Sequence, residues 1–541
     1  MNKQYSLGIE FSTQSVKIVV LDINEHTVAY TGKFDYDIQF PRYNTKGGVL
    51  PVDNDNIRHT SPFMLIEAID MTFKKLVEDK IDLTKIAAVK IDAMQHCTIY
   101  TDKNLAGVLS NLVPQKDLLQ QLKPVISRQT SPIWEDHSPV EQAEYLTREL
   151  SSKGGINNIT GNKAELRFPG PQIMKWAKES RDEYNNTAHI FLLSAFITSV
   201  LSGTIVGVDT GDGWGTNLNT LDINNPEWSK DVFKVIDSYL KNNNIAADAA
   251  FDEENKLTQK IGAITHYDQP MGKISDYFVK KYNLDPNTVI LAGTGDNPAT
   301  LLGCGGGVVI SLGSSYTVNG VMTDIKPAQE GEYNVFGYTK GTAMSLTCFS
   351  NGGKLHEEFL RKYILKSEQG QISADTWAEY AKFAGPDKIG EDESLMLPYL
   401  MAETVPLKDK GIIRDGFDAE EGSINIRALH ISQVLALKLH SKQLSGLNRI
   451  CIVGGASGNK FFRQLITDAF EAESYIIKNA DFAAPFGCAL AAARYALNIS
   501  YEQAVDIFVE KEEGSTLIPD KENSDIFKVL VKRYSELEKR N

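Results

Sequence analysis

Apolar residues come in short runs along the chain, and most runs are followed by small polar residues. The run 288–292 comes after a turn-forming Asp-Pro-Asn sequence and ends at Gly293, which is the pattern of a buried strand. Next, Asn297 and Pro298 supply an N-cap residue and a proline at the first helical position. The pattern therefore predicts a strand, a tight corner and a helix, with Asp296 at the corner.

Two longer stretches share a second pattern, in which a hydroxyl-rich turn separates two apolar runs. One covers residues 7–22 and the other covers residues 308–321. Each predicts a β-hairpin whose turn offers amide and hydroxyl groups to phosphate oxygens, although Ser and Thr are also ordinary turn residues. The recurrence of this hairpin predicts a duplicated α/β fold with one phosphate-binding turn in each half.

Two further apolar runs end in polar or glycine-rich segments. The run 86–91 leads to Gln95 and His96, and the run 449–453 leads to the small residues 454–459. Ligands of open α/β sheets bind at the carboxyl ends of strands, so these segments are candidate binding sites. A His at a strand end is also commonly a structural hydrogen-bonding residue.

Length and glycine content suggest where the chain divides. With 541 residues the chain is too long for one ordinary core. Residues 303–307 are its most glycine-dense segment and are a candidate hinge. We therefore expect one domain over residues 1–302 and a second over residues 303–541.

Charge and cysteine content exclude several functions. The formal net charge of −14 argues against binding to nucleic acid or to an anionic membrane. The five cysteines show no paired spacing of a zinc site or a disulfide framework, which indicates a reducing compartment. No apolar segment of signal-peptide type follows the first residues, and the run 191–201 is too short to cross a membrane. These features predict a cytoplasmic protein.

Three further segments carry candidate ligand contacts. Trp134 and Asp136 place an aromatic ring beside a carboxylate, a pair that suits a sugar, although a buried Trp near a helix start is an equal explanation. A capping box at Ser138 predicts that helix start. Arg167 lies in a turn-rich loop, and residues 208–217 form a glycine-rich loop that a small ligand could approach closely. Asp296 itself is explained either as a capping carboxylate or as a functional group.

The order and approximate spacing of these segments resemble those of the FGGY carbohydrate kinases, which belong to the actin-like and hexokinase-like ATPase superfamily. Within that family the chain is most similar to the eukaryotic-type xylulokinases, over essentially its whole length. The segments that carry the resemblance are 131–136, 166–168 with Gln172 and Ile173, 212–217, 294–300, 311–315 and 454–459. The resemblance implies two duplicated ribonuclease-H-like domains with a central cleft, the first binding sugar and the second binding nucleotide.

The resemblance also implies a role for individual residues. Asp296 would be the general base and would contact the sugar. The implied sugar contacts are Gln95, His96, Trp134, Asp136, Arg167 and Asn297. The implied ATP contacts are Ser12, Thr13, Gln14 and Lys17 in the first turn, Gly313, Ser314 and Ser315 in the second, and Trp377, Gly454, Gly455 and Asn459 around the adenosine.

The activity implied by the resemblance is ATP-dependent phosphorylation of the terminal 5-hydroxyl of D-xylulose. Mg²⁺ would be held through water by Glu10, at a position where the family usually has Asp. Cys97 replaces a usual glycine, and Trp214 occupies a position that is commonly small. Phosphorylation of another ketose or polyol, such as ribulose, and a catalytically weak, kinase-like sugar sensor stay open as alternatives. The expected partners are the sugar and ATP, with the chain acting as a monomer or a homodimer.

Overall fold

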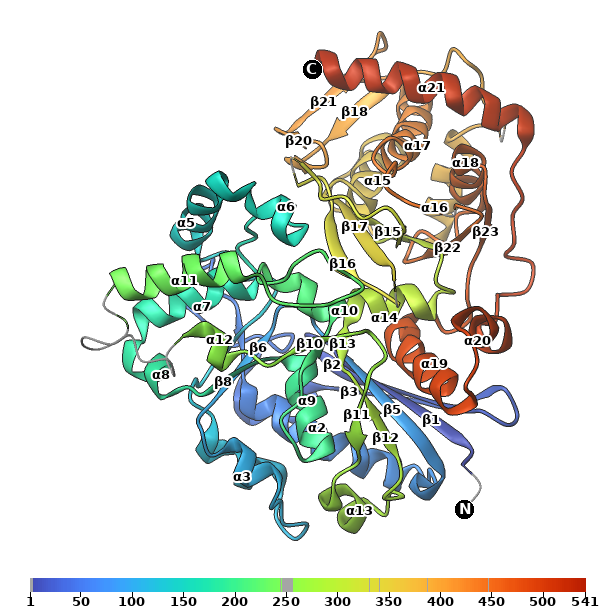
Figure 1. Ribbon diagram of the computed structural model, residues 1–541. Coiled ribbons are helices and arrows are strands. Elements are labelled where there is room, and N and C mark those ends of the chain that lie inside the picture. The colour runs from blue at the N-terminus through green and yellow to red at the C-terminus, as the bar shows by residue number, and fades with distance from the viewer. Residues whose placement is uncertain are drawn as a thin grey trace.

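Two α/β halves, each built around one main sheet, make up the computed structural model (Figure 1). It describes residues 3–243, 245, 256–329, 331–339, 341–386, 388–445 and 447–541. The first sheet uses strands from residues 5–295, and the second uses strands from residues 308–475.

The first sheet is a meander of three antiparallel strands extended by parallel strands, with one further antiparallel strand, β11, at its edge. Its order is β11-β12-β5-β1-β2-β3, and β13 pairs with the far end of β5. Both β5 and β12 run parallel to β1, so their carboxyl ends meet at one edge. The strands are β1 (Tyr5–Phe11), β2 (Ser15–Asp22), β3 (Thr27–Asp35), β5 (Ile86–Ala93), β11 (Pro270–Lys273), β12 (Val289–Leu291) and β13 (Thr294–Gly295).

The second sheet repeats this arrangement in the order β16-β17-β15-β14-β22-β23. Again a three-stranded antiparallel meander is followed by parallel strands, here β22 and β23. The two predicted hairpins and the duplicated α/β fold are thus confirmed, whereas the boundary at residue 302 stays a prediction. The strands are β14 (Val308–Leu312), β15 (Tyr316–Met322), β16 (Asn334–Gly337), β17 (Ala343–Phe349), β22 (Arg449–Val453) and β23 (Glu473–Tyr475).

Helices and short strand pairs surround the two sheets. The helices before residue 304 are α1 (Tyr36–Gln39), α2 (Pro62–Glu78), α3 (Leu105–Leu109), α4 (Leu118–Leu122), α5 (Val140–Leu150), α6 (Ile156–Thr160), α7 (Pro169–Glu179), α8 (Arg181–Asn186), α9 (Leu193–Ser202), α10 (Thr210–Gly213), α11 (Lys230–Asn242), α12 (Leu257–Lys260), α13 (Asp276–Tyr282) and α14 (Asp296–Gly303). Those after it are α15 (Gly353–Leu360), α16 (Ala374–Phe383), α17 (Gly422–Leu439), α18 (Lys460–Phe470), α19 (Ala483–Leu497), α20 (Tyr501–Phe508) and α21 (Lys521–Arg540). The short strands are β4 (His59–Thr60), β6 (Thr98–Thr101), β7 (Ser131–Pro132), β8 (His189–Leu192), β9 (Val208–Asp209), β10 (Ile264–Thr265), β18 (Met396–Tyr399), β19 (Glu403–Thr404), β20 (Leu407–Lys408) and β21 (Gly411–Arg414).

Helix α19 ties the C-terminal part of the chain to the first sheet, beside α14 at the centre of the molecule (Figure 1). A Cβ atom at Gly8 of β1 would lie 1.9 Å from the Pro485 carbonyl oxygen of α19. A Cβ atom at Gly487 would lie 2.0 Å from the Ala299 carbonyl oxygen of α14. Glycine is therefore required at both contacts, and the backbones of these elements pack directly against one another.

Two helix starts differ from the expected ones. Helix α14 begins at Asp296 with Gly295 as its N-cap residue, because the Asn297 side chain bonds laterally to other side chains instead of capping the helix. Helix α5 has Pro139 as its N-cap residue and no capping side chain, because the Ser138 hydroxyl donates to Asp136. Asn297 has a partner distant in sequence, Gln95, whereas Ser138 bonds to Asp136 only two residues earlier.

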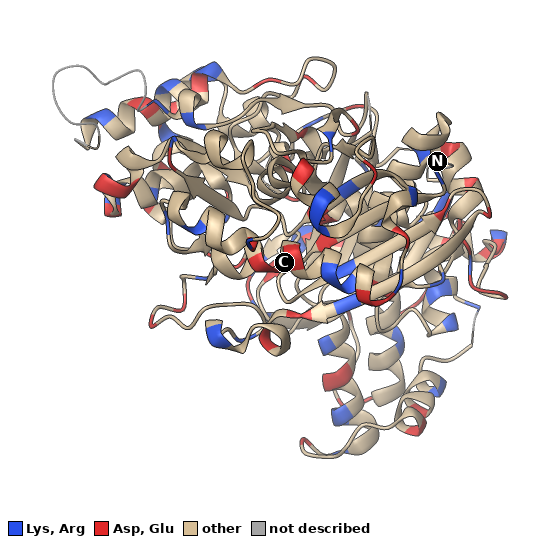
Figure 2. Cartoon of the chain, turned by 90° about the horizontal axis from the view of Figure 1, so that it is seen from below, with Lys and Arg blue, Asp and Glu red and all other residues tan. Residues whose placement is uncertain are grey.

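Charge distribution and helix hydrophobicity bear on possible contacts with nucleic acid and membranes. Figure 2 shows Lys and Arg interspersed with Asp and Glu over the elements in that view. Among the described helices, none combines the length and the apolar character needed to cross a bilayer.

Candidate active site

Three carboxylates gather at the carboxyl ends of adjacent strands in the first sheet. Glu10 of β1 is directly opposite Asp92 of β5, and Thr294 of β13 is opposite Asp92 on the other side. Asp296 follows two residues later at the start of α14. Burial, and then the negative charge of Glu10, raise the pKa of Asp296 to about 7. A carboxylate with a pKa near neutrality is suited to accept a proton from a bound hydroxyl.

A chain of side-chain amides orients Asp296. Asn297 Nδ2 donates to Asp296 Oδ1 at 2.9 Å and to Gln95 Oε1 at 2.7 Å. Gln95 Nε2 in turn donates to the Gly211 carbonyl oxygen at 3.1 Å. A Cβ atom at Gly295 would lie 2.5 Å from Gln95 Cγ, so any side chain at this corner would displace Gln95. The predicted residues Gln95, Asp296 and Asn297 therefore form one connected group.

The other two carboxylates lie behind this group. Glu10 Oε2 is 3.1 Å from Lys17 Nζ, yet burial still raises the pKa of Glu10. Asp92 is completely buried, and its Oδ1 atom has no hydrogen-bond partner among the described residues. Burial and the charges of Glu10 and Asp296 raise the pKa of Asp92 well above its usual range. The cluster therefore strongly disfavours full ionisation of all three groups.

His96 lies next to this cluster in a strained conformation, with φ at +71°. Its Nδ1 atom is 2.8 Å from the Gly215 carbonyl oxygen. A carbonyl oxygen only accepts hydrogen bonds, so Nδ1 carries the proton and Nε2 is left as an acceptor. Burial, and then the charge of Arg167, lower the pKa of His96 to about 3, which keeps the ring neutral. The ring stacks on Phe168 with centroids 4.4 Å apart.

The loop that contains β7 connects this region to the first turn. Trp134 is 45% exposed, and its Nε1 atom donates to Thr13 Oγ1 at 3.0 Å. Its ring is thus free to contact a ligand while its N–H fixes it to a residue of the first turn. Trp134 therefore joins the predicted sugar-contact loop to a predicted phosphate contact.

Asp136 is fully buried, and both of its carboxylate oxygens already have partners. It accepts from Gln172 Nε2 at 2.7 Å, from the Arg58 N–H at 2.9 Å and from Ser138. Burial opposes its ionisation, but the hydrogen bonds from His59, Ser138 and Gln172 outweigh burial and lower the pKa of Asp136 well below its usual range. This geometry favours a role in fastening the loop, and a direct sugar contact stays a prediction.

The first turn, residues 12–14, is fixed by bonds of its own. Both the Ser12 N–H and the Ser12 hydroxyl donate to the Ser15 carbonyl oxygen, at 3.0 and 2.8 Å. Gly48 packs so closely that a Cβ atom there would lie 1.9 Å from the Thr13 carbonyl oxygen, and Gln14 covers Gly47. The turn is therefore preorganised. The positively charged Lys17 lies close to the turn, as the third residue of β2.

The second turn, Gly313 to Ser315, is held in the same way by the start of α15. The Gly353 N–H donates to the Gly313 carbonyl oxygen at 2.9 Å, and Gly352 packs against the backbone of Ser315. Gly454 has φ at +94°, and a Cβ atom there would lie 2.8 Å from the Leu312 backbone. The ends of β14 and β22 therefore approach one another closely, and the role of residues 454–459 in ligand binding stays a prediction.

Comparison with known proteins supplies the family. Residues 308–496 match the model of the FGGY family of carbohydrate kinases, C-terminal domain. Xylulose kinase 2 of Arabidopsis thaliana is 30% identical over 90% of this chain and 86% of the relative. The xylulose kinase of Schizosaccharomyces pombe is 30% identical over 98% of this chain and 97% of the relative. The chain belongs to the FGGY family of carbohydrate kinases. The crystal structure of xylulose kinase from Rhodospirillum rubrum has the same fold, with a TM-score of 0.77 at 14% identity over 99% of this chain and 98% of that one.

In this FGGY kinase a network of buried side chains connects Trp377 to the second turn. Trp377 is 40% exposed on α16, and its ring meets Tyr380 edge-on at 5.6 Å. The Tyr380 hydroxyl is 2.8 Å from His356 Nδ1, and His356 Nε2 is 2.6 Å from Gln433 Oε1. Gln433 Nε2 then donates to the Asn351 carbonyl oxygen at 2.8 Å, next to the segment that holds the second turn. The network fixes an exposed aromatic ring relative to the second turn, which is a predicted phosphate contact.

The remaining predicted adenosine contacts lie at the start of α18. Asn459 is the N-cap residue of α18, and its side chain accepts from the Phe462 N–H at 3.1 Å. A Cβ atom at Gly455 would meet no other atom within 4 Å, so that position borders open space. Both positions stay predicted contacts for adenosine.

Sequence reasoning missed a buried ion pair beneath the Asp296 corner. Lys90 of β5 is fully buried, and its Nζ atom donates to the carbonyl oxygens of Tyr267 and Ala292 at 2.5 and 2.6 Å. It also lies 3.3 Å from Asp209, the N-cap residue of α10. A lysine and an aspartate inside an otherwise apolar strand, Lys90 and Asp92, were the signal that could have located this network.

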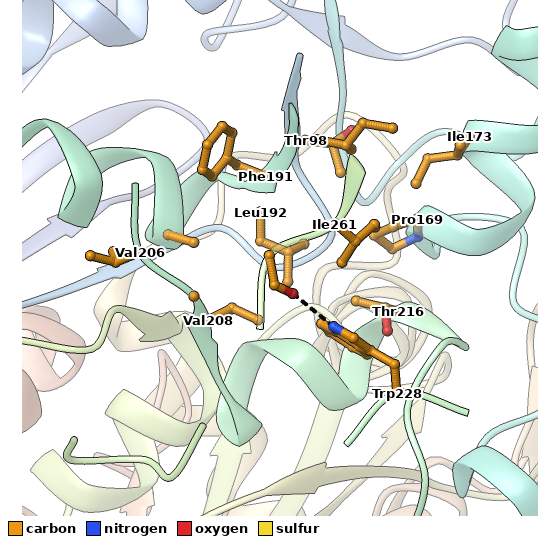
Figure 3. A pocket seen from close by; sticks show the side chains of 14 residues that line it. Thr98, Pro169, Ile173, Phe191, Leu192, Val206, Val208, Thr216, Trp228 and Ile261 are labelled. Atoms are coloured by element: carbon orange, nitrogen blue, oxygen red, sulfur yellow. Dashed lines mark hydrogen bonds between the residues drawn. The ribbon is translucent and has the colours of Figure 1, made fainter. Parts of the chain in front are cut away.

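A small cavity near the site does not fit a sugar. Figure 3 shows its mainly apolar lining, including Phe191, Val208 and Trp228, whose Nε1 atom donates to the Gly262 carbonyl oxygen at 2.7 Å. Its free volume is about 20 Å³. That is room for about one water molecule, so the cavity is a packing feature of the first half.

Proposed function

We propose that this FGGY kinase transfers the γ-phosphate of ATP to the terminal 5-hydroxyl of D-xylulose to give D-xylulose 5-phosphate. The observation that carries the proposal is the Asp296 corner, where a carboxylate with a pKa near 7 is oriented by Asn297 and Gln95. The two relatives that share 30% identity with the chain are both xylulose kinases, which supports D-xylulose as the sugar.

The proposed sugar pocket uses polar groups with fixed hydrogen-bonding roles. His96 Nε2 would accept a hydrogen bond from a sugar hydroxyl, because Nδ1 already donates to Gly215. The Arg167 guanidinium would donate to sugar oxygens, and Trp134 would cover an apolar face. Asn297 Oδ1 would accept from a sugar hydroxyl, because Nδ2 already donates to Asp296 and Gln95. Asp296 would then accept the proton of the terminal hydroxyl as that oxygen attacks phosphorus.

The nucleotide is proposed to lie on the second half. Ser12, Thr13 and Gln14 would bind phosphate oxygens from one side and the residues of the second turn from the other. Trp377 would flank the adenine, with Gly454, Gly455 and Asn459 next to the ribose. Phosphoryl transfer needs positioning and charge neutralisation more than covalent catalysis, and two preorganised turns supply both.

The carboxylate cluster is suited to hold Mg²⁺ through water molecules. Asp92 Oδ1 is buried and unpartnered among the described residues, and Glu10 lies opposite it. In the described part of the chain no group of three His, Cys, Asp or Glu side chains could hold a metal directly. Mg²⁺ usually keeps several waters and binds one or two carboxylates together with substrate phosphates, so Glu10 and Asp92 are the residues proposed to hold it. Bound Mg²⁺ would neutralise charge on the transferred phosphoryl group.

A second candidate function follows from the ion pair of Glu10. Because Lys17 lies 3.1 Å from the Glu10 carboxylate, it competes with a metal for that group. A chain in which the ion pair persisted would bind sugar with weak turnover, as a kinase-like sensor.

We also propose a cytoplasmic location, since all five cysteines are free thiols. We propose that the acting unit is a monomer or a homodimer.

The experiment is ADP release by the purified protein with ATP, Mg²⁺ and a panel of D-xylulose, D-ribulose, L-ribulose, xylitol and glycerol. We expect D-xylulose to give the highest kcat/KM. A higher kcat/KM for D-ribulose or a polyol would replace the proposed sugar. Thermal stabilisation by a ketopentose without ADP release would favour the sensor.

A further inference from the structure

Strand β16 belongs to the second sheet but lies against the first half of the molecule. It pairs with β17 at the edge of that sheet, which leaves its other side open to different partners. The side-chain amide of Asn162 occupies that side, donating to the Val335 carbonyl oxygen at 2.9 Å and accepting from the Val335 N–H at 2.9 Å. One buried side chain thus pairs with the strand as a neighbouring strand would.

The rest of β16 approaches the proposed sugar pocket closely. A Cβ atom at Gly337 would lie 2.2 Å from Thr210 Cβ, in the short helix α10. The ring of Phe336 lies 6.3 Å from the ring of His96. A strand of the C-terminal half therefore lies beside His96, whereas the predicted sugar contacts all come from the N-terminal half.

Asn334, the first residue of β16, contacts Arg167 directly. Arg167 Nη2 donates to Asn334 Oδ1 at 2.8 Å, whereas the Glu165 carboxylate lies farther from the guanidinium, at 3.6 Å. Asn334 Nδ2 donates to Glu165 Oε1 at 3.2 Å and to Asn162 Oδ1 at 3.1 Å. These partners fix the orientation of the amide, because turning it over would point its NH₂ group at the guanidinium.

We propose that Asn334 is a positioning residue for sugar recognition, which holds the Arg167 guanidinium in the orientation that meets the ketose. This inference rests on the proposed function. An arginine side chain loses conformational entropy when a ligand fixes it in one rotamer. A guanidinium that is already held in place loses less conformational entropy on sugar binding, so the sugar binds more tightly. The affinity of the N-terminal half for sugar therefore depends on the contact that β16 of the C-terminal half makes with Arg167.

The main test is Asn334→Ala, with initial rates measured at saturating ATP over a range of D-xylulose concentrations. We expect the KM for D-xylulose to rise about tenfold, because a hydrogen bond to a charged group is lost. Both kcat and the KM for ATP should stay within about twofold of wild type, because the variant leaves Asp296 and the nucleotide side intact. Thermal unfolding measured in parallel reports whether the variant is folded.

Asn157→Ala is a matched control. Asn157 Nδ2 also donates a hydrogen bond from the first half to the second, to the Ala328 carbonyl oxygen at 3.1 Å. Its acceptors are backbone carbonyl oxygens of a loop, and it does not contact Arg167. We expect its KM for D-xylulose to equal that of wild type. If Asn157→Ala raised this KM as much as Asn334→Ala, general contact between the halves would explain the effect and the proposal would be overturned.

A double-mutant cycle with Arg167→Ala shows whether Asn334 acts through the guanidinium. In the Arg167→Ala background, Asn334→Ala should change the KM for D-xylulose by less than about twofold, since its partner is already gone. A full tenfold effect in that background, or an unchanged KM for Asn334→Ala alone, would contradict the proposal. Asn334→Asp keeps an acceptor for Arg167, and we expect a KM between those of wild type and Asn334→Ala.

Wild-type turnover is a separate comparison. The sugar panel on the wild type tests the proposed activity, whereas the Asn334 proposal is tested by ratios between variants and the wild type on the sugar that the panel selects. Failure of one is therefore distinguishable from failure of the other.

Discussion

The two sheets share one scaffold but differ in charge at corresponding positions. Near the end of β1, Glu10 pairs with Lys17 on the antiparallel side and with Asp92 on the parallel side. At the corresponding position of β14, Ser311 pairs with Thr317 and with Val453. The same backbone geometry therefore carries an ionisable cluster in the first half and neutral residues in the second.

This difference suggests a division of work between the halves. Ionisable groups placed together perturb each other's pKa, which suits proton transfer and charge neutralisation. A neutral sheet edge with glycine and hydroxyl turns suits a nucleotide, which is bound through its phosphates and a flat base. Duplication supplied two similar edges, and the charged residues distinguish them.

The largest effect is expected for Asp296→Asn, which removes the proposed base at nearly constant shape. We expect kcat to fall by about 10²- to 10⁴-fold, the usual contribution of a positioned general base. The Kd for D-xylulose, measured by calorimetry, should change little because the amide still bonds to neighbouring groups. A variant with wild-type kcat would remove Asp296 from the chemistry.

Glu10→Gln and Ser311→Ala compare the corresponding positions directly. Loss of the Glu10 charge should lower kcat on the order of a hundredfold by misplacing the metal and the phosphoryl group. Ser311→Ala should leave kcat within about threefold, since no charge is lost. Equal effects at the two positions, measured as kcat with saturating Mg²⁺, would contradict the division of work.

Trp377→Ala examines the neutral half. Removal of a stacking surface for adenine should raise the KM for ATP about tenfold, while the KM for D-xylulose stays unchanged. Trp377→Phe is the matched control, because it retains an aromatic face. A change confined to the sugar KM would place the nucleotide elsewhere.

The smallest expected effect is a shift in pH dependence. Because Asp296 acts as a base only when deprotonated, and its pKa is about 7, kcat/KM for D-xylulose should rise as the pH increases through about 7. Removing the neighbouring charge in Glu10→Gln should lower the pKa of Asp296 and move this rise to lower pH. A midpoint that stays the same in Glu10→Gln would show that Glu10 does not tune the base.

Much of the fold followed from local sequence. The strand 449–453 and the two hairpins were predictable because apolar runs and turn residues are local signals. The start of α14 was not predictable, because the Asn297 side chain donates a hydrogen bond to Gln95 and does not cap the helix.

The site was only partly predictable for the same reason. Gln95, Asp296 and Asn297 could be named from strand ends and family resemblance, and the structure connects them. The pairing of Glu10 with Asp92 depends on strand register, which no short motif encodes. The contact between Arg167 and Asn334 joins residues 167 positions apart, so only the folded chain reveals it.

Hydrogen exchange with one ligand at a time tests the division of work most directly. D-xylulose alone should slow amide exchange in peptides that cover residues 92–97 and 294–297 and leave peptides around 377 and 454–459 unchanged. A non-hydrolysable ATP analogue with Mg²⁺ should slow exchange around 313–315 and 454–459. Protection of residues 454–459 by D-xylulose alone, with none at 294–297, would contradict the account.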